Sequence, residues 1–319
     1  MWEGKGNADL KLNGQTIVPG AQQLVKIEIA KLPTGTVIDL PVHVFNASKK
    51  GPVVLLQAGL HGDEINGVEV LRKLLVDKKI KLKRGALIVV PILNLFGFIH
   101  FSRDVPDGKD VNRSFPGSNK GSLASRIAYT YAQEVLPLAD IAIDLHTGGG
   151  QRYNYPQIRY TAEDLGGKTL AEVFNAPFNF PSSLIRGSFR NEAFKLGKTV
   201  LVYEAGESMR FSAEAMRIAK VGILNVLNYL QMIKTNDEPL KTKSIALTKR
   251  RWIRAPRAGM FLSEIANGSK IEKGQPLGYI TDTNDQKIKR IKAPFDGYVF
   301  CINNQAVVNQ GDALYHIGH

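Results

Sequence analysis

The stretch VVLLQAGLHGDE, at residues 53–64, joins an apolar segment to a cluster of polar side chains. Its first seven residues are almost wholly apolar and end in glycine, which is typical of a strand buried on both faces. After HGDE, apolar residues recur with helical spacing at Ile65, Val68, Leu71, Leu74 and Leu75. The stretch therefore predicts a buried strand, a polar turn and a helix.

The same alternation continues along the chain. Further buried strands are predicted at residues 86–92, 140–146 and 198–203, and helices at 123–135, 162–174 and 213–233. A long loop rich in Asp, Gly, Pro and Asn covers residues 94–120, and loops of that length in compact domains are usually functional or disordered. Apolar strands that alternate with helices predict an α/β fold, with a mixed, mainly parallel sheet covered by helices on both faces.

A different pattern begins after residue 240. Residues 253–280 resemble residues 291–317, with Ala255-Pro256 aligned to Ala293-Pro294 and Gly259 aligned to Gly297. Each half consists of short strands around turn glycines, which favours a small all-β barrel or sandwich. We therefore expect an α/β domain at residues 1–240 and a β domain at residues 241–319.

The composition is that of a globular protein, with 44% hydrophobic and 22% charged residues among 319. Cys301 is the single cysteine, so no intrachain disulfide can form. The first residues lack the apolar segment of a signal peptide, and no apolar run approaches the roughly 18 residues that span a bilayer. We expect a cytoplasmic protein that does not enter a membrane.

The formal net charge is +13. The densest basic clusters, at residues 78–84, 241–254 and 287–292, do not interleave with several aromatic residues, as a nucleic-acid surface would. We therefore expect no nucleic-acid partner. A basic field would instead attract anionic small molecules.

His61 and Glu64 lie three positions apart at the predicted strand-to-helix junction, where both side chains can point at one spot. An imidazole nitrogen and a carboxylate oxygen are natural zinc ligands. Alone, the pair is a weak signal, because His61 could form a loop hydrogen bond and Glu64 could be a favourable first-turn acid. His146, at the end of another apolar strand, strengthens the metal interpretation, since two histidines and one glutamate form a known catalytic zinc set. Asp144, on the same face of that strand, is placed to orient a ligand imidazole.

Glu204 follows a further apolar strand, where it can take a proton from a water molecule at the metal. Glu207 is a less favoured alternative. The long loop contributes Arg103, Asn112 and Arg113, whose guanidinium and amide groups suit a carboxylate or a developing oxyanion. Ligand sites in open α/β sheets lie at the carboxyl ends of the strands, where His61, His146 and Glu204 are all predicted.

Four segments in this order resemble the succinylglutamate desuccinylase/aspartoacylase family, within the wider zinc carboxypeptidase group. They are AGLHGDE at 58–64, the R-x6-D-x-NR-x-FPG string at 103–117, DLHTG at 144–148 and YEAGES at 203–208. The C-terminal repeat resembles the biotinyl/lipoyl-like β-barrel appended to such enzymes.

The resemblance implies a zinc-dependent hydrolase that cleaves the amide bond of an N-acyl amino acid, with one Zn²⁺ per chain. It implies His61, Glu64 and His146 as zinc ligands and Glu204 as general base and acid. Arg103 would stabilise the oxyanion, and Asn112 and Arg113 would hold the free carboxylate of the substrate. Co²⁺ or Mn²⁺ also fits such a ligand set.

Two departures from the family pattern stand out. Lys287 lacks the flanking methionines of biotin carriers, so we expect no covalent cofactor there. No tyrosine matches the one that some relatives use near the substrate, although Tyr153 and Tyr155 are candidates by their proximity to His146.

Three alternatives stay open at this point. The first is a metallocarboxypeptidase acting on short peptides, because pocket size is not visible in the sequence. The second is a non-catalytic binding module, and the third is a catalytically inactive relative. The oligomeric state is also open, and a homo-oligomer is compatible with the sequence.

Overall fold

The computed structural model describes residues 8–77, 81–234, 243–284 and 288–319. Two sequence interpretations concern positions outside these ranges. One is the domain boundary near residue 240, and the other is Lys287 as a carrier lysine. Both stay predictions.

Four parallel strands form the centre of the main sheet, in the order β10–β7–β5–β6. They are β5 (Val53–Ala58), β6 (Ala86–Val90), β7 (Ile141–Gly148) and β10 (Thr199–Glu207). Every residue of β5, β6 and β7 is buried, as their apolar sequences predict. The predicted α/β fold class is confirmed. Strand β10 continues past Tyr203, so Glu204 lies within the strand rather than after it.

Antiparallel strands flank this centre. On one side β4 (Val37–Asn46) pairs with β6, and β3 (Gln22–Lys31) pairs with β4. On the other side β8 (Arg152–Tyr160) pairs antiparallel with β10, followed by β9 (Phe178–Pro181) and the short β11 (Ile245–Ala246) in parallel. Strands β1 (Leu10–Leu12) and β2 (Gln15–Ile17) form a separate hairpin. Strands β3, β4 and β8 are not among those expected from the sequence. Strands β3 and β4 alternate buried and more exposed residues, unlike the continuous apolar runs of the central strands, and β8 is rich in polar residues.

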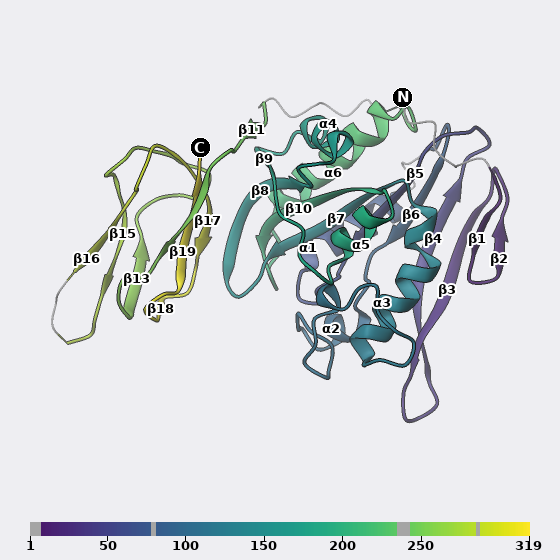
Figure 1. Ribbon diagram of the computed structural model, residues 1–319, viewed down its shortest axis with the longest axis horizontal. Coiled ribbons are helices and arrows are strands. Elements are labelled where there is room, and N and C mark those ends of the chain that lie inside the picture. The colour runs from purple at the N-terminus through teal and green to yellow at the C-terminus, as the bar shows by residue number, and fades with distance from the viewer. Residues whose placement is uncertain (1–7, 78–80, 235–242, 285–287) are drawn as a thin grey trace.

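Helices cover both faces of the sheet (Figure 1). One face carries α1 (Ile65–Val76), α4 (Leu165–Phe174) and α6 (Ala213–Tyr229), which share one hydrophobic core with the sheet. The other face carries α2 (Leu95–Ile99), α3 (Leu123–Glu134) and α5 (Phe189–Lys195), packed into a second core. Two 3-10 turns, η1 (Val111–Arg113) and η2 (Leu136–Leu138), complete the connections. The loop predicted at residues 94–120 therefore contains a helix and a turn.

The C-terminal residues form strands, as predicted. A four-stranded sheet contains β16 (Lys289–Lys292), β15 (Pro276–Thr281), β13 (Gly259–Ser263) and β18 (Val307–Val308). It packs on β12 (Arg250–Arg254), β19 (Ala313–Gly318), β17 (Gly297–Asn303) and β14 (Lys270–Ile271) through a hydrophobic core of its own.

The main sheet continues from the α/β part of the chain into the C-terminal strands. Strand β17 pairs antiparallel with β8, so β17, β19 and β12 extend the same sheet that carries β7 and β10. A small cluster of Phe178, Phe180, Leu247 and Phe300 joins the two parts beside this pairing. The division of the chain at residues 240/241 stays a prediction, but the two parts share one sheet.

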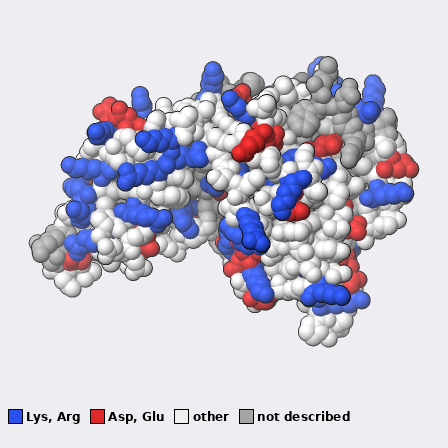
Figure 2. Space-filling model, in the orientation of Figure 1, with Lys and Arg blue, Asp and Glu red and all other residues white. Residues whose placement is uncertain are grey.

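Lys and Arg side chains gather over the C-terminal strands on the face shown in Figure 2. Strand β16 alone has three exposed basic residues, Lys289, Arg290 and Lys292. The basic residues are thus less evenly scattered than the sequence suggested, and the absence of a nucleic-acid partner stays a prediction. Among the described residues, no helix is both long and apolar enough to cross a membrane.

Packing between α6 and α4 depends on a glycine. A Cβ atom at Gly222 would lie 2.2 Å from Cε1 of Phe174, whose side chain is fully buried.

We predict that Gly222→Ala lowers the free energy of unfolding, because overpacking costs about 1–3 kcal/mol while helix propensity returns at most about 1 kcal/mol. Urea denaturation would measure the change. Asn228→Ala, at an exposed position of the same helix, is the control and should stay within about 0.5 kcal/mol of wild type. A Gly222→Ala protein as stable as the control would contradict this account of the packing.

Candidate metal centre and active site

The turn after β5 places His61 and Glu64 at the carboxyl end of that central strand. A Cβ atom at Gly62 would lie 1.9 Å from the backbone carbon of Gly97, so the turn packs directly on the backbone of α2 and only glycine fits. The backbone N–H of Glu64 donates to the carbonyl of His61 at 3.2 Å, which closes the turn. His61 and Glu64 are both buried, with 4% and 2% of their surface exposed. This tight turn fixes the two side chains on one side of the loop.

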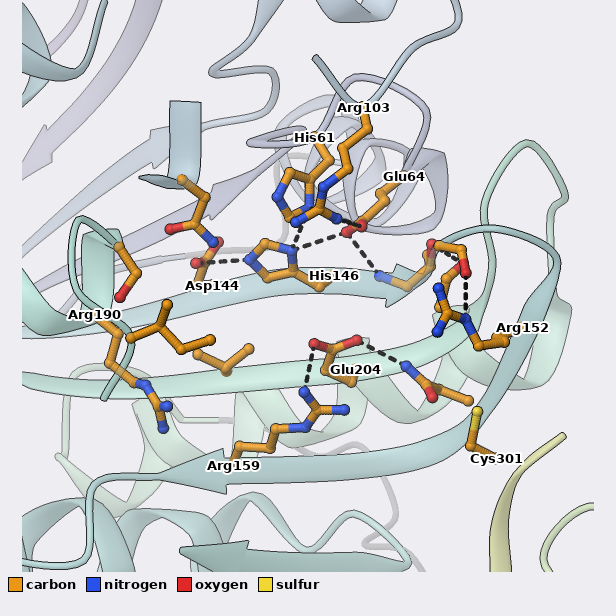
Figure 3. A pocket seen from close by; sticks show the side chains of 18 of the residues that line it. His61, Glu64, Arg103, Asp144, His146, Arg152, Arg159, Arg190, Glu204 and Cys301 are labelled. Atoms are coloured by element: carbon orange, nitrogen blue, oxygen red, sulfur yellow. Dashed lines mark hydrogen bonds and ion pairs between the residues drawn. The ribbon is translucent and has the colours of Figure 1, made fainter. Parts of the chain in front are cut away.

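His61, Glu64 and His146 converge on one point, as the sequence predicts (Figure 3). The two oxygens of Glu64 each lie 2.8 Å from an imidazole Nδ1, Oε1 from that of His61 and Oε2 from that of His146. The two Nδ1 atoms are 3.2 Å apart. The structure thus brings together three side chains with competent ligand atoms.

The outer nitrogens of both imidazoles face carboxylates. His146 Nε2 lies 2.8 Å from Oδ2 of Asp144, and His61 Nε2 makes a looser contact of 3.4 Å with Oδ1 of Asp110. At His146, the close contact favours a proton on Nε2 and directs the Nδ1 lone pair toward the shared centre. Two Nδ1 lone pairs and a carboxylate, facing one another in a buried site, match the donor set of catalytic zinc. The residues therefore fit a divalent cation.

The local electrostatics favour positive charge. Burial alone would lower the pKa of His146, but Asp144 and Glu64 outweigh it and raise the pKa well above its ordinary value. Burial would likewise raise the pKa of Glu64, but His61 and His146 hold it far below the usual range. A site that attracts protons so strongly also attracts a metal cation, which would replace them.

Arg103 reaches the same centre from the long loop. Its Nη1 lies 3.2 Å from Nδ1 of His61 and 3.7 Å from Oε1 of Glu64. Its Nε and Nη2 both donate to Oδ2 of Asp110, at 3.2 and 2.9 Å. Asp110 therefore orients both Arg103 and His61, and these two groups lower the pKa of its carboxyl although burial opposes the change.

Glu204 lies beside the metal centre, on β10 next to β7, where it pairs in register with His146. Both of its oxygens are held by side chains of β8. Arg159 Nη1 is 3.1 Å from Oε1, and Asn154 Nδ2 donates to Oε2 at 2.8 Å. Arg159 and Asn154 are not among the site residues expected from the sequence, because the strand β8 on which they lie is not among the expected strands. The signal was present as polar residues spaced along residues 152–159, shortly after the glycines that follow His146.

One cavity of about 250 Å³ is lined by the three candidate ligands, by Arg103, and by Glu204 with its two partners on β8. Asn112 and Arg113 also line it, so the structure brings every predicted site residue to this cavity. Asn112 Oδ1 accepts a hydrogen bond of 2.9 Å from the backbone N–H of Phe189, and Arg113 is about half exposed. Arg152, Arg159 and Arg190 are further basic residues in the lining, and the sequence analysis foresaw none of them. Nothing in the sequence around Arg190 distinguishes it from a surface arginine.

The less favoured candidates from the sequence, Glu207, Tyr153 and Tyr155, do not line the cavity. Glu207 is buried, and its Oε2 accepts a hydrogen bond of 2.7 Å from Asn304. The hydroxyl of Tyr153 is 3.1 Å from Oγ of Ser212, and the ring of Tyr155 packs against Phe178.

Residues 50–230 match the model of the succinylglutamate desuccinylase/aspartoacylase catalytic domain, and the match spans more than half of the chain. The protein belongs to this family, as its motifs suggested.

Relatives match over nearly the full chain. An N-alpha-acetyl-L-2,4-diaminobutyric acid deacetylase from Halomonas elongata is 26% identical over 288 residues, which cover 86% of this chain and 84% of the relative. The crystal structure of a succinylglutamate desuccinylase/aspartoacylase from Rhodobacter sphaeroides superposes with a TM-score of 0.84 at 26% identity, covering 93% and 95% of the two chains. The product-bound ectoine utilization protein EutE (DoeB) from Ruegeria pomeroyi gives 0.81 at 26% identity, covering 93% and 94%. These likenesses include the C-terminal strands.

The contact between Asp144 and His146 provides a test of the metal centre. We predict that Asp144→Asn weakens zinc binding about 10–100-fold, because the ligand imidazole loses the carboxylate that orients it. Competition with a fluorescent chelator would measure the affinity. Asp107→Asn, an exposed substitution in the long loop, is the matched control and should leave the affinity unchanged. Equal zinc affinity in the two variants would show that Asp144 does not support the site.

Proposed function

We propose that this protein is a zinc-dependent deacylase that hydrolyses the amide bond of a small N-acyl amino acid. The observation that carries the proposal is the convergence of His61, Glu64 and His146 beside Glu204 in one cavity. Membership of the family and the deacetylase named among the relatives support the same chemistry.

Zinc held by His61, Glu64 and His146 would supply a water acidified toward a pKa of about 7 and a Lewis acid for the carbonyl oxygen. The carboxylate of Glu204 accepts a proton from the attacking water and later delivers it to the leaving nitrogen. Arg159 and Asn154 hold the two oxygens of that carboxylate in place. Arg103 stabilises the negative charge that develops on the carbonyl oxygen.

Asn112 and Arg113 bind the free carboxylate of the substrate in this proposal. Arg113 is about half exposed; its Nη1 donates to the backbone carbonyl of Asn112 at 2.8 Å and is 3.8 Å from the carboxylate of Asp110, so the guanidinium is held beside the cavity while half of the side chain stays accessible. A planar fork of that kind suits bidentate binding of a carboxylate. Anchoring the substrate at this end makes attack on the amide effectively unimolecular.

The size of the cavity bears on the rival carboxypeptidase function. Its volume of about 250 Å³ is below the roughly 300–1,000 Å³ of typical ligand pockets. A volume of that order supports a compact N-acyl amino acid over a peptide. A panel of N-acyl amino acids and dipeptides, assayed by release of the free amine, would separate the two activities.

The role of Glu204 can be tested against a neighbour of the same type. We predict that Glu204→Gln lowers kcat about 10²–10⁴-fold through loss of acid–base catalysis, while zinc content stays at the wild-type level. Glu207→Gln is the matched control, since Glu207 lies three residues away on the same strand but does not line the cavity. It should keep nearly full activity. Full activity in Glu204→Gln would assign proton transfer to another group.

Carboxylate binding by Arg113 gives a separate prediction. Arg113→Ala should raise KM with a smaller effect on kcat, because the lost interaction is present in both ground state and transition state. Steady-state kinetics on the best substrate of the panel would measure both constants. Lys109→Ala, an exposed cation in the same loop, controls for a general change in the electrostatic field. An unchanged KM in Arg113→Ala would remove this residue from the substrate site.

A further inference from the structure

The C-terminal strands contribute directly to the cavity. Trp252 of β12 and Cys301 of β17 line it together with the metal centre, while the other lining residues lie between positions 61 and 204. Cys301 is buried, with 1% of its surface exposed, whereas Trp252 is partly exposed. Trp252 is therefore the large apolar surface that the C-terminal strands present to the cavity.

Strand pairing explains how Trp252 reaches the site. In the antiparallel pairs, Trp252 lies opposite His316, His316 opposite Cys301, and Cys301 opposite Asn154. Directly opposed residues of antiparallel strands project from the same face of the sheet. The four residues thus form a row across β12, β19, β17 and β8. The row ends at Asn154, which donates to Glu204.

The indole of Trp252 is held in place by stacking. Its ring is 4.1 Å from that of His316, at an angle of 13°, and His316 in turn lies 4.3 Å from the ring of Phe300. Burial and the charges of Arg159 and Arg250 lower the pKa of His316 to about 3, so the imidazole is neutral at physiological pH. An aromatic ring with one face fixed in this way forms a rigid wall.

The cavity has two ends on either side of Glu204. Figure 3 shows Arg190 on one side of Glu204 and Arg152 and Cys301 on the other. Asn112 belongs to the Arg190 end, because it binds the backbone of Phe189. With the substrate carboxylate at Asn112 and Arg113, the acyl group extends past Glu204 toward Cys301 and Trp252.

We infer that Trp252 is a specificity-determining residue that contacts the acyl group of the substrate and limits it to a few carbon atoms. This inference rests on the proposed function. It makes the C-terminal strands part of the active site and assigns them the selection of short acyl groups.

A pair of substrates of different acyl length tests this role. We would measure kcat/KM in wild type and variants for N-hexanoyl-L-glutamate and N-acetyl-L-glutamate, and for Nα-hexanoyl- and Nα-acetyl-L-2,4-diaminobutyrate. For each amino acid, the quantity compared is the ratio of the hexanoyl value to the acetyl value. Trp252→Ala should raise the ratio by about 10-fold or more, since a few methylene groups in a pocket are worth at least that factor. Trp252→Phe should give a smaller rise. Arg251→Ala, an exposed substitution on the same strand, should leave the ratio unchanged.

Zinc content, measured on each variant, shows that the centre is intact in the proteins compared. A ratio that stays within twofold of wild type in zinc-loaded Trp252→Ala would overturn the assignment. If wild type hydrolyses neither these compounds nor any N-acyl amino acid of the panel, the proposed function fails, and the role of Trp252 is then decided by binding alone.

Fluorescence provides that binding test. The chain has two tryptophans, Trp2 and Trp252, so a Trp2→Phe protein reports on Trp252 alone. Titration of the zinc-loaded Trp2→Phe protein with N-acetyl-L-glutamate and Nα-acetyl-L-2,4-diaminobutyrate should shift or quench the emission in a saturable manner. Unchanged emission, with binding of the same compound shown by calorimetry, would place the acyl group away from the indole and contradict the inference.

Discussion

The negative potential that three carboxylates create around two buried imidazoles is the electrostatic feature on which the site depends. Glu64 contacts both Nδ1 atoms, while Asp144 and Asp110 face the outer nitrogens of His146 and His61. Such a cluster is costly to bury unless positive charge compensates it. A divalent cation would meet that requirement and would also supply the Lewis acid of the proposed amide hydrolysis. In the proposed function, the compensation of buried charge and the chemistry thus depend on the same ion.

The sheet brings these groups together from distant parts of the sequence. His61 follows β5, His146 lies on β7 and Glu204 on β10, and these three strands are adjacent and parallel. Their carboxyl ends meet at one edge, which is where open α/β sheets bind ligands. The sequence could predict this much, because apolar runs mark the buried parallel strands and three of these runs lead to the chemically competent residues His61, His146 and Glu204.

Other parts of the site could not be predicted in this way. Arg159 and Asn154 lie on β8, whose polar residues hide the strand pattern, and Arg190 becomes part of the site only through the packing of α5. Asp110 was visible in the loop, but its simultaneous contact with Arg103 and His61 depends on how the loop folds back. The place of Trp252 follows from the pairing of β17 with β8, which links segments about 150 residues apart. Sequence periodicity indicates strands, but it does not indicate which strands become neighbours.

The measurement that tests the central claim most directly is the metal content of the purified protein, wild type beside His146→Ala. Elemental analysis should find about one zinc ion per wild-type chain, as expected for a site with two histidines and one glutamate. It should find that ion lost from a variant whose circular dichroism spectrum is unchanged. A wild-type protein that binds no metal when zinc is supplied, or a His146→Ala protein that retains it fully, would contradict the account.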